Sequence, residues 1–285
     1  MSAAFALVRA AHFLSLMTVF GASALLWQAR DIRGIDETMQ RVINASAWIA
    51  FVTAALWIVL VAREVGDVAV PDAGLLADIT TKTYFGKVGI WRLILLLALC
   101  DSWYSIRYPG PRAIVAGAAL ALLGLTSHAA SSGAVSLFFA RAAVDAAHLL
   151  AAGFWVGGLV VLVHEVLAEP RDVPRLVALL RRFSRWGVVS VSVLVIAGAL
   201  NGVFILGETP QWSGTYVTLL ATKIVLAAFM VAVALVNKFS ILPGLARNEA
   251  EAIDTIPLTV IAELSSAVVV LVIVGFLGVT PPMQM

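Results

Sequence analysis

Long apolar stretches separated by short polar connections dominate this chain. Eight stretches reach about 20 residues, the length that a helix rising about 1.5 Å per residue needs to cross a hydrocarbon core about 30 Å thick. None shows the alternation of apolar and polar positions that is typical of a membrane β-strand. The pattern therefore predicts transmembrane helices, since helices satisfy their own backbone in lipid. They are expected at residues 3–29, 42–62, 86–105, 112–130, 141–166, 186–206, 215–237 and 256–279.

The composition indicates the same class of protein. Of 285 residues, 61% are hydrophobic and 13% are charged, whereas a soluble domain is about 25% charged. We predict an all-α integral membrane protein, a single domain over residues 1–285 that forms a bundle of eight transmembrane helices. The first apolar run has no basic region before it and is too long for a signal peptide, so we expect it to be retained. Cys100 is the only cysteine, which excludes a disulfide framework or a CxxC metal motif.

Basic residues are concentrated in alternate connections, which predicts the orientation of the chain. Cytoplasmic loops of membrane proteins carry an excess of lysine and arginine, and the bias here is twelve against four. We therefore expect a multi-pass protein of the bacterial inner membrane with both termini extracytoplasmic, in the periplasm. The richer side holds Arg30, Arg33, Arg41, Arg107, Arg112, Arg171, Arg175, Arg181, Arg182, Arg185, Lys238 and Arg247, and the poorer side holds Arg63, Lys82, Lys87 and Arg141.

Three of the four histidines are expected on the outward side of the membrane. Ionisable residues inside membrane spans are costly, so each of them is a functional hypothesis. By helical rise and the predicted orientation, His12, His128 and His148 all lie in the outer half. His164 follows His148 by sixteen positions, about 24 Å along the same helix, and belongs at the cytoplasmic end. Its HisGlu pair lacks the second histidine of a HExxH zinc motif.

Other polar residues are expected at comparable depth. Asp145 precedes His148 by three positions and shares its helical face, where a carboxylate can orient an imidazole or bind metal. Arg92, Asn201 and Lys223 also fall in the outer half. The two cations would repel a metal, so they pair with Asp145, line an anion or quinone pocket, or extend toward the membrane surface.

The side chains available suit a soft or borderline metal. Neutral imidazole is a ligand for copper and zinc, and thioethers favour Cu(I). Met17 follows His12 by five positions, and Met283 and Met285 in the PPMQM tail are possible ligands at the entrance. Packing is the competing interpretation for Met17, and a flexible terminus is the competing one for the tail.

Three further features are expected to lie apart from this group. Gly153 and Gly157 form a GxxxG spacing, which we interpret as a close helix–helix contact. Glu263 falls in the inner half of the last span. The outward connection over residues 63–85 contains LLADITTKTYFG, which predicts a short interfacial helix.

At these residues the chain resembles the CopD (PcoD-like) family of bacterial copper-resistance membrane proteins. The resemblance lies in SHA at 127–129 and DAAHLLAAGFWVGGL at 145–159, and it covers nearly the whole chain. Other matching stretches are AAHFLSLMTVFGA at 10–22, TYFGKVGIWR at 83–92, RFSRWG at 182–187, and Lys223 with Asn237 and Lys238 in TLLATKIVLAAFMVAVALVNK.

The resemblance implies a membrane protein that handles periplasmic copper and passes it toward the cytoplasm. Carried over by position, His12, His128 and His148 are the implied copper ligands. The chain has no fused periplasmic copper-binding domain, so a CopC-like chaperone would be a separate partner, and lipid is the other expected contact. Nothing in the sequence points to nucleic acid or fixes the oligomeric state. On the cytoplasmic side of the midplane, no series of Met, Cys or His residues offers further copper ligands. The sequence therefore supports a copper site better than a copper channel.

Two alternatives remain open from the residues. Histidines on facing helices can ligate haem axially, so His12 with His148 would suit a b-type haem or quinone-linked oxidoreductase, an enzyme. A copper sensor or assembly factor that does not transport is the third interpretation. A haem and metal measurement distinguishes the oxidoreductase from a copper transporter. A flux assay distinguishes the sensor or assembly factor from a copper transporter.

Overall fold

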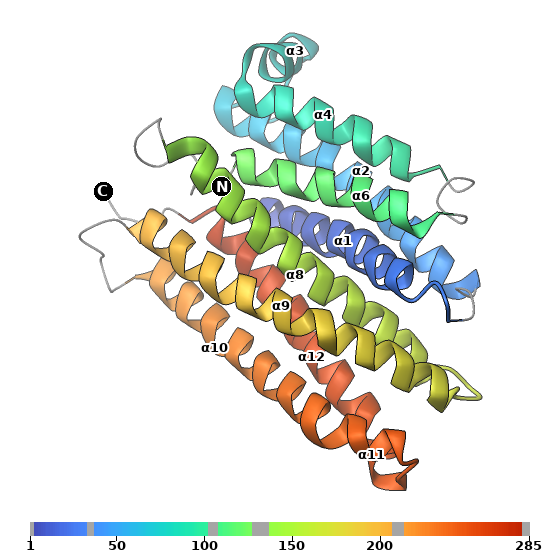
Figure 1. Cartoon of the computed structure of the whole chain (residues 1–285). Coiled ribbons are helices and arrows are strands. Elements are labelled where there is room, and N and C mark those ends of the chain that lie inside the picture. The colour runs from blue at the N-terminus through green and yellow to red at the C-terminus, as the bar shows by residue number, and fades with distance from the viewer. Residues whose placement is uncertain (1–2, 33–36, 102–107, 127–136, 207–213, 281–285) are drawn as a thin grey trace.

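The computed structural model describes residues 3–32, 37–101, 108–126, 137–206 and 214–280. Helices without any strand make up the secondary structure of this part of the chain, which confirms the predicted all-α class. Figure 1 shows the long helices side by side in one bundle. They are α1 (Ala3–Gln28), α2 (Glu37–Gly66), α3 (Ala73–Lys82), α4 (Tyr84–Leu99), α6 (Pro109–Ala121), η1 (Leu122–Thr126), α8 (Phe138–Leu167), α9 (Val173–Leu206), α10 (Thr215–Val236), η3 (Asn237–Ile241), α11 (Leu242–Ala246) and α12 (Ala250–Leu277).

Seven helices within the described ranges are long and apolar enough to cross a membrane. They correspond to the predicted spans apart from the third. That segment, expected at residues 86–105, contains α4, which has 16 residues, and residues 102–107 lie outside the described part. The third predicted span, and with it the total of eight, therefore stays a prediction.

The connection between α2 and α4 contains the helix predicted from its sequence. Asp72 caps α3 by accepting a hydrogen bond from the backbone N–H of Leu75 at 2.7 Å. Thr83 ends α3 and caps α4, accepting from the N–H of Gly86 at 2.9 Å. A side-chain oxygen at this position satisfies an N–H group that the first helical turn leaves free. The break at Thr83 is thus a cap between two helices.

α1 is the central helix, and it packs against α2, α6, α8 and α12. Its contact with α8 is made by glycines. A Cβ added at Gly157 would lie 2.5 Å from the carbonyl oxygen of Met17 and 2.6 Å from the Cα of Gly21. A Cβ added at Gly21 would meet the carbonyl oxygen of Gly153. Backbone touches backbone here, which confirms the packing interpretation of the GxxxG spacing.

The chain directions bring the polar residues of interest into the same half of the bundle. α1 begins at the end where α12 finishes (Figure 1). His12 and His148 each lie about three turns into α1 and α8, which begin at this end. The opposite end holds Arg182, which pairs with Asp31, together with Arg30 and Arg185. These arginines belong to the connections that the sequence predicts to be the more basic, and the orientation of the chain stays a prediction.

Candidate functional site

The predicted site residues fall into two groups that face different helices. The first is centred on His12 of α1, which is fully buried against α2 and α4. The second is centred on His148 of α8, which faces α9 and α10. Each group has its own contacts, so each is described separately.

Both ring nitrogens of His12 are engaged by the protein. An NH2 nitrogen of Arg92 lies 2.6 Å from Nε2. A guanidinium only donates, so Nε2 accepts and the proton of the neutral ring is on Nδ1. Nδ1 lies 3.1 Å from the carbonyl oxygen of Ala50 and 3.1 Å from Oγ1 of Thr53. The Arg92 contact therefore selects one tautomer and ties α1 to both α2 and α4.

Trp57 of α2 lies beside this pair. Its ring centroid is 5.6 Å from that of His12 in an edge-to-face arrangement. The guanidinium carbons of Arg9 and Arg92 lie 4.4 Å and 5.4 Å from the Trp57 ring centroid. An aromatic face attracts a cation more strongly where water is absent. Trp57 thus helps to hold two arginine charges inside the bundle.

The second group surrounds His148, one helical turn after Asp145. Asn201 of α9 donates from Nδ2 to Oδ1 of Asp145 at 3.1 Å, which fixes the carboxylate. His148 packs against Gly198, where an added Cβ would lie 3.3 Å from Cε1 of the ring. The backbone of Leu194 is nearby, but the buried Nδ1 makes no hydrogen bond of acceptable geometry with a described residue.

Positive charge borders the His148 group. Lys223 of α10 is partly buried and interacts electrostatically with both His148 and Asp145. Arg141 lies two turns before His148 on α8, with its guanidinium carbon 4.9 Å from the ring centroid of Phe204. Asp145 provides the negative charge in this group and offsets one of the cations.

The structure does not present His12 and His148 as a facing pair. His12 contacts Ala50, Thr53 and Arg92, whereas His148 contacts residues of α9 and α10. Within the described ranges, no three His, Cys, Asp or Glu side chains converge as a metal-binding group. For His12 and His148 to ligate one haem axially, both rings would have to turn away from these contacts.

Three of the predicted ligands lie outside the described residues: His128, Met283 and Met285. Their roles stay predictions. Met17 is buried in α1, and its Cγ lies 3.5 Å from the position of a Cβ added at Gly153. This contact places it in the packing between α1 and α8.

Sequence reasoning missed Arg9, Trp57 and the burial of Arg112. Arg9 precedes His12 by three positions, so the spacing that shares a helical face was the available signal. Arg112 was assigned to a basic connection, but it is 1% exposed and donates from Nε to Oγ of Ser23 at 2.7 Å. Pro109 begins α6 a turn earlier than expected, which carries Arg112 into the bundle.

Comparison with known proteins gives consistent matches along the chain. The family described as Copper resistance protein D-like, N-terminal domain, matches residues 1–137, and the family Copper resistance protein D matches residues 177–277. Copper resistance protein D of Pseudomonas syringae pv. tomato is 31% identical over 306 aligned positions, which cover 96% of each chain. Inner membrane protein YebZ of Escherichia coli (strain K12) is 28% identical, over 96% of this chain and 97% of YebZ.

A shorter match is to Copper transport protein CutJ of Bacillus subtilis (strain 168). It is 40% identical over 65 residues, which are 22% of this chain and 12% of CutJ. No solved structure matches the chain significantly. The full-length matches and the two family matches agree with the resemblance drawn from the sequence motifs.

Proposed function

The chain belongs to the copper resistance protein D family, and from that premise we propose that it is an inner-membrane protein that receives copper at an outward site around His148 and moves it across the membrane. Its full-length relatives include a protein named for copper resistance and one named for the inner membrane. The proposed role is copper handling rather than catalysis.

The observation that carries the proposal is the state of the His148 ring. Nδ1 is buried, and it makes no hydrogen bond of acceptable geometry with any described residue. A buried polar atom without a partner is unfavourable and calls for an explanation. Neutral imidazole is a good ligand for copper, so a metal at this nitrogen would supply the missing interaction.

Asp145 and Lys223 support the same site. Asp145 lies one turn from His148 and is oriented by Asn201. Partners that orient the first ligands are a regular part of metal sites. Lys223 repels a cation, but Asp145 opposes its charge.

The segment that leads to His128 packs beside the His148 turn of α8 as far as η1. A Cβ added at Gly124 of η1 would lie 2.5 Å from the carbonyl oxygen of Ala142 and 3.0 Å from the backbone nitrogen of Ala146. η1 therefore lies against the turn of α8 that precedes His148. His128 lies outside the described residues, and its role as a second imidazole ligand is proposed from the sequence.

His12 is not available as a third ligand in this conformation, because both of its ring nitrogens are hydrogen-bonded. It becomes available only if Arg92 releases Nε2. The proposal therefore rests on His148 and His128, with His12 as a group that holds α1, α2 and α4 together. A separate periplasmic CopC-like chaperone remains our expectation for the source of copper.

Copper flux into proteoliposomes tests transport. We expect the wild-type protein to move copper, His148→Ala to lose flux, and His164→Ala, which changes a histidine at the other end of the same helix, to keep it. Copper binding without flux in the wild type would support the sensor or assembly interpretation and contradict transport.

A further inference from the structure

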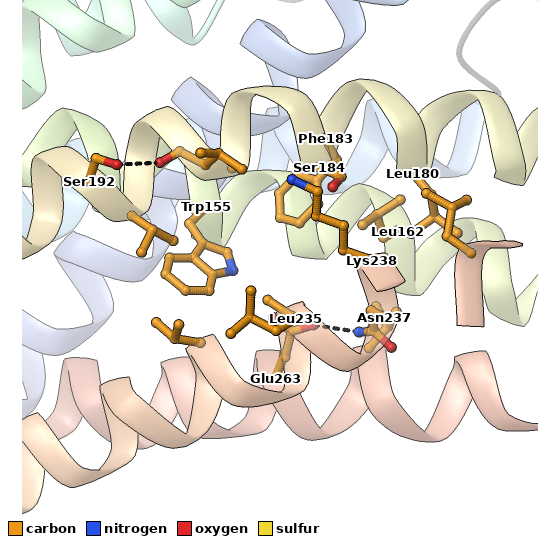
Figure 2. Close-up of a pocket in the computed structure, with 17 residues that line it drawn as sticks. Trp155, Leu162, Leu180, Phe183, Ser184, Ser192, Leu235, Asn237, Lys238 and Glu263 are labelled. Carbon is orange, nitrogen blue, oxygen red and sulfur yellow. Dashed lines mark hydrogen bonds between the residues drawn. The ribbon is translucent and has the colours of Figure 1, made fainter. Parts of the chain in front are cut away.

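A second polar site lies in the other half of the bundle. A pocket of about 180 Å³ is lined by residues of α8, α9, α10, η3 and α12 (Figure 2). Its lining is mostly apolar, with Phe183 on one side. Trp155, Asn237 and Glu263 form a polar end. A volume of this size has room for several water molecules or an ion.

Two oxygen atoms at the polar end lack a partner. Glu263 is 2% exposed and Asn237 is 8% exposed. Asn237 donates from Nδ2 to Oε2 of Glu263 at 2.8 Å. Oε1 of Glu263 and Oδ1 of Asn237 make no hydrogen bond of acceptable geometry with a described residue. The Trp155 indole lies beside the carboxylate without completing such a bond. Both free oxygens are acceptors that a donor or a cation can satisfy, and the unpaired N–H of Trp155 is the protein donor beside Glu263.

The backbone around Asn237 is locally widened. Residues Asn237–Ile241 form a π-helical turn, in which the N–H of Leu242 bonds to the carbonyl oxygen of Asn237. Such turns are rare and are frequent at functional sites. The turn places Asn237 and Lys238, which are consecutive in sequence, on the lining of the same cavity.

The charges facing the cavity restrict the ion that fits. Glu263 on α12 and Lys238 on η3 are the ionisable groups among the described lining residues, and α8 and α9 contribute none. Figure 2 shows Lys238 extending toward Ser184 on α9, away from Glu263. Ca²⁺ sites use several carboxylates and Mg²⁺ usually binds one or two together with substrate phosphates, and copper favours imidazole or sulfur ligands. One carboxylate, an amide oxygen and water suit a monovalent hard cation instead.

We propose that this cavity binds a monovalent hard cation, either Na⁺ with Oε1 of Glu263 and Oδ1 of Asn237 as its protein ligands or, in its place, a proton on the Glu263 carboxylate. The site is separate from the His148 group and lies nearer the end that carries Arg30 and Arg182. The cation site does not depend on the proposed function.

Sodium binding to the purified, copper-free full chain tests the site. Radioactive Na⁺ is measured by equilibrium dialysis for the wild type and Glu263→Gln, which keeps an acceptor for Asn237 but removes the charge. Glu251→Gln, on an exposed residue of the same helix, is the matched control. We expect the wild type and Glu251→Gln to bind Na⁺ and Glu263→Gln to lose it. Lys238→Gln removes the opposing charge and is expected to tighten Na⁺ binding severalfold.

A second arm identifies the ion. Infrared difference spectra are recorded on moving each protein between two pH values in sodium-free buffer. A carboxyl band present in the wild type and absent in Glu263→Gln, without Na⁺ binding, supports the protonated form of the proposal, in which the proton is on Glu263. Na⁺ binding and carboxyl bands that are both unchanged in folded Glu263→Gln overturn it. Copper binding measured on the same samples is expected to be unchanged, so failure of the cation site is distinct from failure of the copper site.

Discussion

Arg92 donates a hydrogen bond to Nε2 of His12 at 2.6 Å, across the contact between α4 and α1. Both residues are buried, at 3% and 0% exposure. Removing Arg92 leaves Nε2 of His12 without a donor, and removing His12 leaves the Arg92 nitrogen without its acceptor, in a region that excludes water. An unpaired buried group of this kind costs about 1–3 kcal/mol. The pair is therefore a structural link as well as part of the outward polar group.

A double-mutant cycle on this pair tests its structural role. His12→Ala and Arg92→Ala are each expected to lower the free energy of unfolding by about 1–3 kcal/mol. The double variant should lose less than the sum, with a coupling of about 0.5–3 kcal/mol. Unfolding in detergent is followed by circular dichroism, with the exposed Arg63→Ala as the control. Strictly additive losses would show that the two side chains do not depend on one another.

The hydrogen bond between Asn201 and Asp145 predicts a graded effect on copper affinity. Asp145→Asn removes the charge that opposes Lys223, and Asn201→Ala releases the carboxylate. Each is expected to weaken copper binding about 10- to 100-fold, as for groups that orient metal ligands. Copper titration against a competing chelator measures this. Asp78→Asn, an exposed aspartate of α3 paired with Lys82, should bind as the wild type does, and equal affinities in all four proteins would exclude Asp145 from the site.

The contact between α1 and α8 predicts that two Gly→Ala substitutions change the free energy of unfolding in opposite directions. Gly157→Ala places a Cβ against the backbone of α1, and separating the helices is expected to cost at least about 2 kcal/mol. Gly202→Ala meets nothing within 4 Å and gains up to about 1 kcal/mol from the better helix former. Thermal unfolding in detergent compares the two. Equal melting temperatures would mean that α1 and α8 are not in backbone contact.

The sequence predicted that His12 and His148 lie at a similar distance from one end of the bundle, and it did not predict the direction in which they face. Helical rise places His12 and His148 about three turns from the same end, as the structure has them. Which neighbour a side chain meets depends on how each helix is rotated in the bundle. That rotation follows from contacts between distant segments, such as Gly21 with Gly153 and Gly157, and a local pattern does not contain it.

The burial of charged residues was the other property that could not be predicted from the local sequence pattern. Glu263 was expected to stand apart from the histidines, and the structure places it in its own cavity. Its pairing with Asn237 depends on the wide turn at the end of α10. No residue in that turn marks it as π-helical, because its sequence, NKFSI, would also suit an ordinary helix. Only the packing of α10 against α12 shows that the two side chains meet.

Metal and haem analysis of the purified protein tests the central claim most directly. The account predicts stoichiometric copper and no haem absorbance in the wild type. It predicts that His148→Ala and His128→Ala lose this copper while His164→Ala retains it. A haem Soret band that disappears in His148→Ala, or copper that is unchanged in that variant, would contradict the account.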